Sequence, residues 1–171
     1  MKPTLFQRMD MWARNLLPVG MTLMLLLVNV APTRIPGFAG LVPVLTLMSV
    51  FYWAIYRPDL MPAYAAFMVG LLYDVISGIP IGVNALVCLL VHGVTVSQRR
   101  FFLGNTFVVT WWAFAVIAAG AAIISWLLVA VLVSFSIRGK AVMFEYLMTI
   151  SLYPLVSWLL ARTQVAFLKP A

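Results

Sequence analysis

Asp74 is the residue best placed to do chemistry, because it is an ionisable residue near the end of an otherwise apolar run. An acidic residue in such a segment is a functional candidate by default. Asn84 begins the next apolar run, beyond a turn. We expect Asp74 to cap free backbone amides there or to bond the Asn84 side chain. A proton relay is disfavoured because no second carboxylate or basic residue is expected within the membrane, whereas binding of a partner remains open.

Small residues surround Asp74 at helical spacing. Ala66, Gly70 and Asp74 repeat every four residues and share one helix face. This spacing lets another helix approach closely, so Asp74 is predicted to face protein rather than lipid. The short turn that follows contains three residues typical of turns, Gly78, Pro80 and Gly82.

A second charged cluster precedes and opens the last apolar run. Glu145 follows closely after Arg138 and Lys140. One interpretation is a carboxylate at the membrane interface, near a helix N-terminus and paired with these cations. The alternative is that Arg138, Lys140 and Glu145 form an external docking patch.

The chain lacks the residues that most enzymes need. His92 is the only histidine and Cys88 the only cysteine, and two such residues one helical turn apart are too few for a metal site. No nucleophile motif, phosphate loop or dinucleotide-binding glycine motif is present. We therefore predict no enzymatic activity, cofactor or metal. His92 is expected to be a core residue, and Cys88 a small hydrophobic residue that faces either the core or the lipid.

The composition places the chain in a membrane. Hydrophobic residues make up 65% of it and charged residues 9%, whereas soluble domains are about half apolar and a quarter charged. The apolar runs are continuous rather than alternating, which favours helices over a barrel. The net charge of +7 comes from residues that flank the runs, which is typical of cytoplasmic loops beside anionic lipid rather than of nucleic-acid binding.

The expected fold is all-α and polytopic, a single transmembrane domain over residues 1–171 with about six spans. These are 16–31, 41–56, 62–76, 83–97, 107–135 and 142–161. The fifth is longer than a bilayer requires, so it tilts, projects beyond the membrane or breaks near Gly120. Residues 1–15 form either an amphipathic interfacial helix or an extension of the first span.

The basic residues predict the orientation. Alternate loops, counted from the N-terminus, contain Lys2, Arg8, Arg14, Arg57, Arg99, Arg100, Arg162 and Lys169, against Arg34, Arg138 and Lys140 in the others. By the positive-inside rule both termini are expected in the cytoplasm. A run of alanines around Gly120 indicates close helix packing within the protein or a groove for another helix.

The stretch 66–86, AFMVGLLYDVISGIPIGVNAL, resembles the signature of the MreD family. That signature is a GLLxD segment, a turn of small residues, and PxGxNAL. The matching residues are Gly70, Leu71, Leu72, Asp74, Gly78, Pro80, Gly82, Asn84, Ala85 and Leu86.

The resemblance implies a non-enzymatic scaffold in the complex that elongates rod-shaped bacteria, located in the inner membrane. Implied partners are MreC, the actin-like MreB, the glycosyltransferase RodA and a class B penicillin-binding transpeptidase. The family is also similar to the substrate-binding subunits of energy-coupling-factor transporters, which implies a compact six-helix bundle. The alternative function is therefore that of a vitamin-binding transporter subunit. In the scaffold hypothesis, the membrane anchor of MreC packs against the small-residue faces of a hairpin fixed by Asp74.

Overall fold

Helix α2 (Leu45–Tyr56) lies at the centre of the molecule. A computed structural model describes residues 5–31, 44–133 and 139–167. Ten of the 12 residues in α2 are buried, and a helix that is apolar on all sides needs neighbours on all sides. Helices α1, α3, α4, α5 and α7 all contact it.

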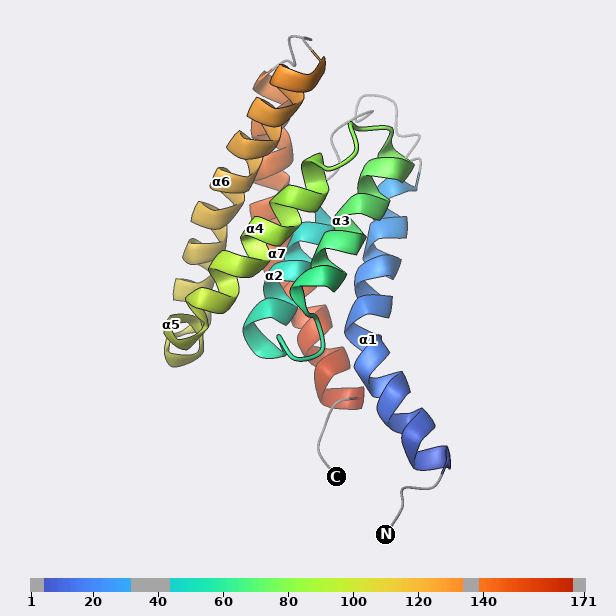
Figure 1. Cartoon of the computed structure of the whole chain (residues 1–171). Coiled ribbons are helices and arrows are strands. Elements are labelled where there is room, and N and C mark those ends of the chain that lie inside the picture. The colour runs from blue at the N-terminus through green and yellow to red at the C-terminus, as the bar shows by residue number, and fades with distance from the viewer. Residues whose placement is uncertain (1–4, 32–43, 134–138, 168–171) are drawn as a thin grey trace.

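The described regular structure is entirely helical, which confirms the predicted all-α class (Figure 1). Around α2 stand six further helices: α1 (Leu5–Val30), α3 (Ala63–Ser77), α4 (Val83–Ser97), α5 (Arg99–Gly104), α6 (Phe107–Val133) and α7 (Gly139–Phe167). Helices α3 and α4 form a hairpin, and α6 packs against both α4 and α7.

The molecule has two distinct ends (Figure 1). The start of α1, α5 and the end of α7 lie at one end, which we call the basic end because Arg99, Arg100 and Arg162 belong to these segments. The turn between α3 and α4, the end of α6 and the start of α7 lie at the other, which we call the hairpin end.

Helix α1 is continuous from Leu5 to Val30, so it includes most of the N-terminal segment together with the first apolar run. Whether that segment lies in the membrane interface stays a prediction. The proline at position 18 does not end α1. The loop predicted for residues 32–40 lies outside the described residues.

Helix α6 is unbroken through Gly120. Its 27 residues extend about 40 Å, against a hydrocarbon layer of about 30 Å. Helices α6 and α7 are long and apolar enough to cross a membrane. The other apolar helical stretches are shorter: Leu16–Val30 within α1, and the helices Leu45–Tyr56, Ala63–Ser77 and Val83–Ser97.

Helix α7 is longer than the apolar run predicted at 142–161. It begins at Gly139 and ends at Phe167. Charge marks where an apolar segment ends, but Lys140 and Arg162 are good helix formers and continue the helix beyond it.

Helix α5 was not predicted, because the double arginine that opens it resembles a loop. Its Phe102 ring is buried 5.6 Å from the Phe51 ring. The Arg99 Nε donates a 2.8 Å hydrogen bond to the carbonyl of Ile55, in the last turn of α2. This cation therefore satisfies an end carbonyl of the central helix.

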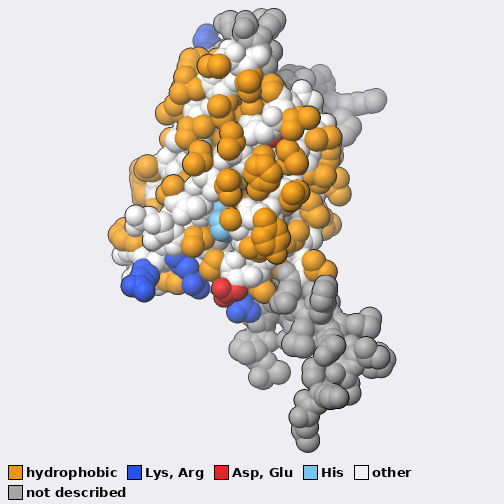
Figure 2. Space-filling view, viewed as in Figure 1, with side chains coloured by type: hydrophobic (Ala, Val, Ile, Leu, Met, Phe, Trp, Pro, Cys, Tyr) orange, Lys and Arg blue, Asp and Glu red, His pale blue; other side chains and the backbone are white. Residues whose placement is uncertain are grey.

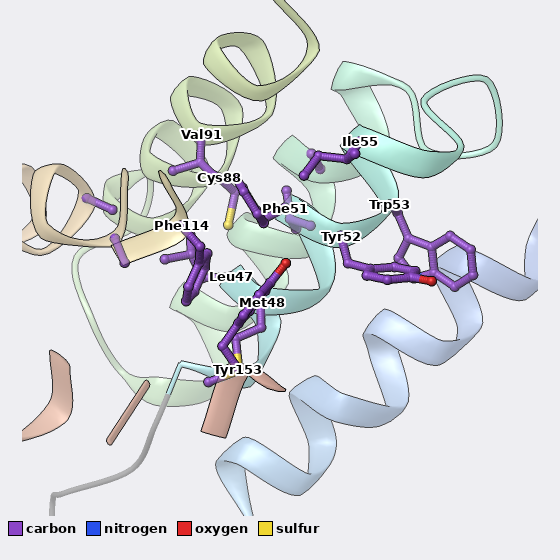
Figure 3. Packing of buried hydrophobic residues seen from close by; sticks show 14 of the residues in the cluster. Leu47, Met48, Phe51, Tyr52, Trp53, Ile55, Cys88, Val91, Phe114 and Tyr153 are labelled. Atoms are coloured by element: carbon purple, nitrogen blue, oxygen red, sulfur yellow. The ribbon is translucent and has the colours of Figure 1, made fainter. Parts of the chain in front are cut away.

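The core is aromatic where α2, α6 and α7 meet (Figure 3). The Phe51 ring lies 5.0 Å from the Phe114 ring and 5.8 Å from the Tyr153 ring. Phe114 and Tyr153 stack at 4.2 Å. Packing of this kind fixes how the three helices cross.

Two hydrogen bonds join α6 and α7, and one of them satisfies a carbonyl that Pro154 leaves without a donor. A proline in a helix has no N–H for the carbonyl four residues earlier, here Ile150. The indole N–H of Trp111 on α6 donates to that carbonyl at 3.1 Å. The Tyr146 hydroxyl donates in the other direction, to the Ala115 carbonyl at 2.9 Å. Such repair allows prolines in membrane helices.

Large apolar side chains cover the outer surface (Figure 2). Exposed examples are Met24, Tyr64, Met68, Val75, Leu90, Trp112, Val116, Val131 and Leu155. Water-soluble monomers rarely expose patches of this extent. The surface is that of a protein whose solvent is lipid.

Candidate functional site

The Asp74 carboxylate is completely buried and accepts four hydrogen bonds from the start of α4. The Oδ1 atom accepts the backbone N–H of Asn84 at 3.0 Å and its side-chain Nδ2 at 2.9 Å. The Oδ2 atom accepts the backbone N–H of Gly82 at 2.9 Å and of Ala85 at 3.2 Å. Both predicted roles of Asp74 are present together.

These bonds complete the N-terminus of α4, where the first backbone N–H groups have no partner within the helix. Asp74 takes those of Asn84 and Ala85, and the Pro80 carbonyl accepts the N–H of Val83 at 3.3 Å. The helix dipole adds a favourable interaction with the carboxylate. Asp74 thus acts as an N-cap supplied by the preceding helix.

The backbone carbonyl of Asp74 caps the C-terminal end of α3. It accepts the N–H of Gly78 and, at 3.2 Å, that of Ile79. Gly78 has φ +67° and Gly82 has φ +104°, a region that side chains with a Cβ rarely adopt. The two glycines therefore allow the chain to reverse within a short turn.

Helices α3 and α4 approach each other closely at Gly70. A Cβ at this position would lie 2.6 Å from the Ala85 Cα and 2.6 Å from the Asn84 carbonyl oxygen. The predicted face of Ala66, Gly70 and Asp74 is buried against the protein itself. The close approach that small residues permit occurs here within the chain.

All six residues predicted for the hairpin are therefore brought together: Gly70, Asp74, Gly78, Pro80, Gly82 and Asn84. A carboxylate has about four lone-pair positions, and those of Asp74 are used. The arrangement stabilises the hairpin of α3 and α4.

The predicted docking patch is divided. Lys140 is exposed in the first turn of α7, and Arg138 lies outside the described residues. Glu145 is half-buried and lines an internal cavity of about 200 Å³. The cavity lies among α2, α3, α4, α6 and α7 and is mostly apolar. Whether the three residues bind a partner remains a prediction.

Several polar residues of this cavity were not predicted. Thr46, Tyr73 and Ser125 line it, together with Asn84 and Thr149. Their signal in the sequence was a hydroxyl inside an apolar helix, which is too common to single out one residue. The alanines near Gly120 pack within the protein, since Ala118 and Ala121 are buried in the core and line the cavity, and Ala122 lines the cavity too.

His92 is a core residue, as predicted, and Cys88 faces the core rather than the lipid. The His92 Nε2 lies 2.7 Å from the Met61 carbonyl oxygen, and both side chains are buried. Among the described residues, no group of three or more histidine, cysteine, aspartate or glutamate side chains could hold a metal ion.

Comparison with known proteins identifies the family. A family model described as rod shape-determining protein MreD matches residues 9–163. No curated protein and no solved structure matches the chain. The match covers nearly all of the sequence, including the Asp74 hairpin and the helices that surround it. The chain therefore belongs to the MreD family of membrane proteins, whose role is in determining rod shape.

Proposed function

We propose that the chain is a non-enzymatic scaffold of the bacterial elongation complex in the cytoplasmic membrane. In this role it binds MreC and supports lateral peptidoglycan synthesis beside MreB, RodA and a class B penicillin-binding transpeptidase. The observation that carries the proposal is the family match over residues 9–163. The Asp74 hairpin is compatible with this proposal, since the Asp74 carboxylate hydrogen-bonds to the start of α4 and stabilises the fold.

The surface available to a partner helix is a groove between α1 and α3. The small-residue face of α3 is occupied by the chain's own α4, so an outer helix cannot pack there as the sequence suggested. The groove has a volume of about 760 Å³, and its wall includes Leu16, Val19, Tyr64, Met68 and Val75. We propose that the MreC anchor lies in it.

The proposed orientation places the basic end in the cytoplasm. Figure 2 shows most of the visible lysine and arginine side chains at the lower end of the molecule. Arg57 follows α2, and Arg99 and Arg100 open α5. The positive-inside rule then locates the hairpin end outside the cytoplasm. Both termini would be cytoplasmic, because α1 begins and α7 ends at the basic end (Figure 1).

Photocrosslinking tests the site of contact. A photoreactive amino acid replaces Met68, which is exposed in the groove, or Val116, which is equally apolar and exposed on α6. We expect MreC to crosslink at position 68 and much less at position 116. Equal yields at both positions would argue against the groove, and no MreC product at either would argue against direct binding.

The rival function is that of a vitamin-binding transporter subunit. It requires polar groups that converge on a ligand, and Asp74 was one candidate. Asp74 is instead spent on the hairpin, whereas Asn84 and Glu145 do line the cavity. A transporter ATPase co-purifying with the chain would support this rival.

A further inference from the structure

The carboxylate, amide and hydroxyl groups that line the cavity can all accept hydrogen bonds, and the hydroxyls of Thr46, Tyr73 and Ser125 can also donate them. Glu145 contributes a carboxylate, and within the described ranges no lysine, arginine or histidine lines the cavity. Tyr146 uses its hydroxyl hydrogen on the Ala115 carbonyl, which leaves its oxygen as an acceptor. Asn84 gives its Nδ2 to Asp74, so its Oδ1 can accept. An occupant that matches these walls donates hydrogen bonds.

Thr46 gives an independent indication that the cavity holds a polar group. Its side chain is 2% exposed, its Oγ1 has no hydrogen-bond partner among the residues that the structure describes, and it lines the cavity. An unsatisfied buried hydroxyl costs free energy and calls for an explanation. Thr149, by contrast, is satisfied, since it donates to the Glu145 carbonyl and accepts the N–H of Val44. A ligand in the cavity would satisfy Thr46.

The remaining walls are apolar, and the cavity adjoins the lipid-facing surface. A groove of about 320 Å³ between α6 and α7 shares Ala122, Trp126, Val142 and Tyr146 with the cavity. An amphiphilic molecule could therefore reach it from the membrane. For size, an engineered apolar cavity of about 150 Å³ holds benzene, so about 200 Å³ suits one aromatic ring with a short polar arm.

We propose that this cavity is a binding site for a small amphiphilic amine, with its ammonium group on Glu145 and its apolar body among α4, α6 and α7. Charge-assisted hydrogen bonds to a carboxylate are short and strong where water is excluded. The inference goes beyond the scaffold function and does not rest on it. The ammonium group can belong to a free amine or to an ethanolamine lipid headgroup, which carry the same chemistry.

Calorimetric titration of the full-length chain in phosphatidylcholine nanodiscs tests the proposal. The probe is 2-phenylethylamine, compared with the uncharged 2-phenylethanol. We expect the amine to bind at least tenfold more tightly than the alcohol. Equal affinities would overturn the proposal, because an apolar void does not distinguish them.

Four variants locate the site. Glu145→Gln is expected to remove the preference for the amine, and Ala122→Phe, which fills the cavity, to abolish binding. Thr46→Val is expected to weaken binding severalfold without loss of stability, because its hydroxyl has no partner to lose. Asp59→Asn removes the same charge at the exposed basic end and is expected to bind normally. Unchanged binding in both Glu145→Gln and Ala122→Phe would overturn the assignment.

The lipid composition distinguishes the two sources of the amine. If phosphatidylethanolamine in the nanodisc competes with the probe, the natural occupant is a lipid headgroup. If it does not, the occupant is a free amine.

Discussion

Asp74 joins two helix ends with one residue. Its backbone carbonyl accepts hydrogen bonds from the N–H groups of Gly78 and Ile79, just after α3. Its carboxylate accepts hydrogen bonds from the first N–H groups of α4. Few other side chains could do both, because the position requires a short acceptor with two oxygens. Glu145 differs, since its carboxylate lines a cavity.

Removal of the Asp74 carboxylate should destabilise the hairpin. In Asp74→Ala the N–H groups of Gly82, Asn84 and Ala85 lose their acceptor, so we expect a loss of about 2–4 kcal/mol. Reversible unfolding in detergent measures it. Asp59→Ala, at an exposed acid, should change stability by less than about 0.5 kcal/mol. Equal effects of the two substitutions would show that the cap contributes little.

The close spacing between α3 and α4 should require glycine at position 70, whereas the glycine at position 93 should be replaceable. Gly70→Ala forces a Cβ into the Ala85 backbone and should cost about 1–3 kcal/mol by overpacking. Gly93→Ala is the matched control within α4, where an added Cβ meets nothing within 4 Å. We expect it to be neutral or stabilising. A neutral Gly70→Ala variant would contradict the close approach.

At the scale of elements, the hairpin was predictable because its residues are local in sequence. Asp74, Gly78, Pro80, Gly82 and Asn84 interact across a single turn, so residue type and spacing were sufficient. The cavity was not predictable, because its walls come from five helices, some of them far apart in the chain. The hydrogen bond between Trp111 and the Ile150 carbonyl could not be predicted for the same reason, since its two residues lie on different helices.

A double-mutant cycle tests that bond between α6 and α7. Trp111→Phe removes the donor and should cost about 1–3 kcal/mol, because the Ile150 carbonyl is left unsatisfied. In a Pro154→Ala background the helix supplies its own N–H to that carbonyl, so Trp111→Phe should cost clearly less. Additive effects in the unfolding measurement would contradict this account.

At the scale of the whole molecule, the helices predicted from apolar runs are present, whereas α5 and the full length of α7 were missed. Both errors arise where charge was taken as the end of a helix. The placement of α2 at the centre could not be predicted, because hydrophobicity does not single it out: α6 is the more apolar helix. Its aromatic neighbours, not its composition, place it there.

Labelling of single cysteines tests the orientation. In a Cys88→Ser background, Ile81→Cys introduces a thiol in the hairpin turn, where the native side chain is 73% exposed. A membrane-impermeant maleimide should label it in intact spheroplasts. Arg100→Cys at the basic end should be labelled only after permeabilisation. The reverse pattern would invert the topology.

If the chain is a scaffold, its partners should remain bound to it during purification. The most direct measurement is affinity purification of the tagged chain from native membranes in mild detergent, with quantitative mass spectrometry. We predict that MreC and wall-synthesis enzymes are retained, that Asp74→Ala reduces their recovery severalfold, and that Gly93→Ala does not. Recovery of transporter ATPases in place of MreC would contradict the scaffold function.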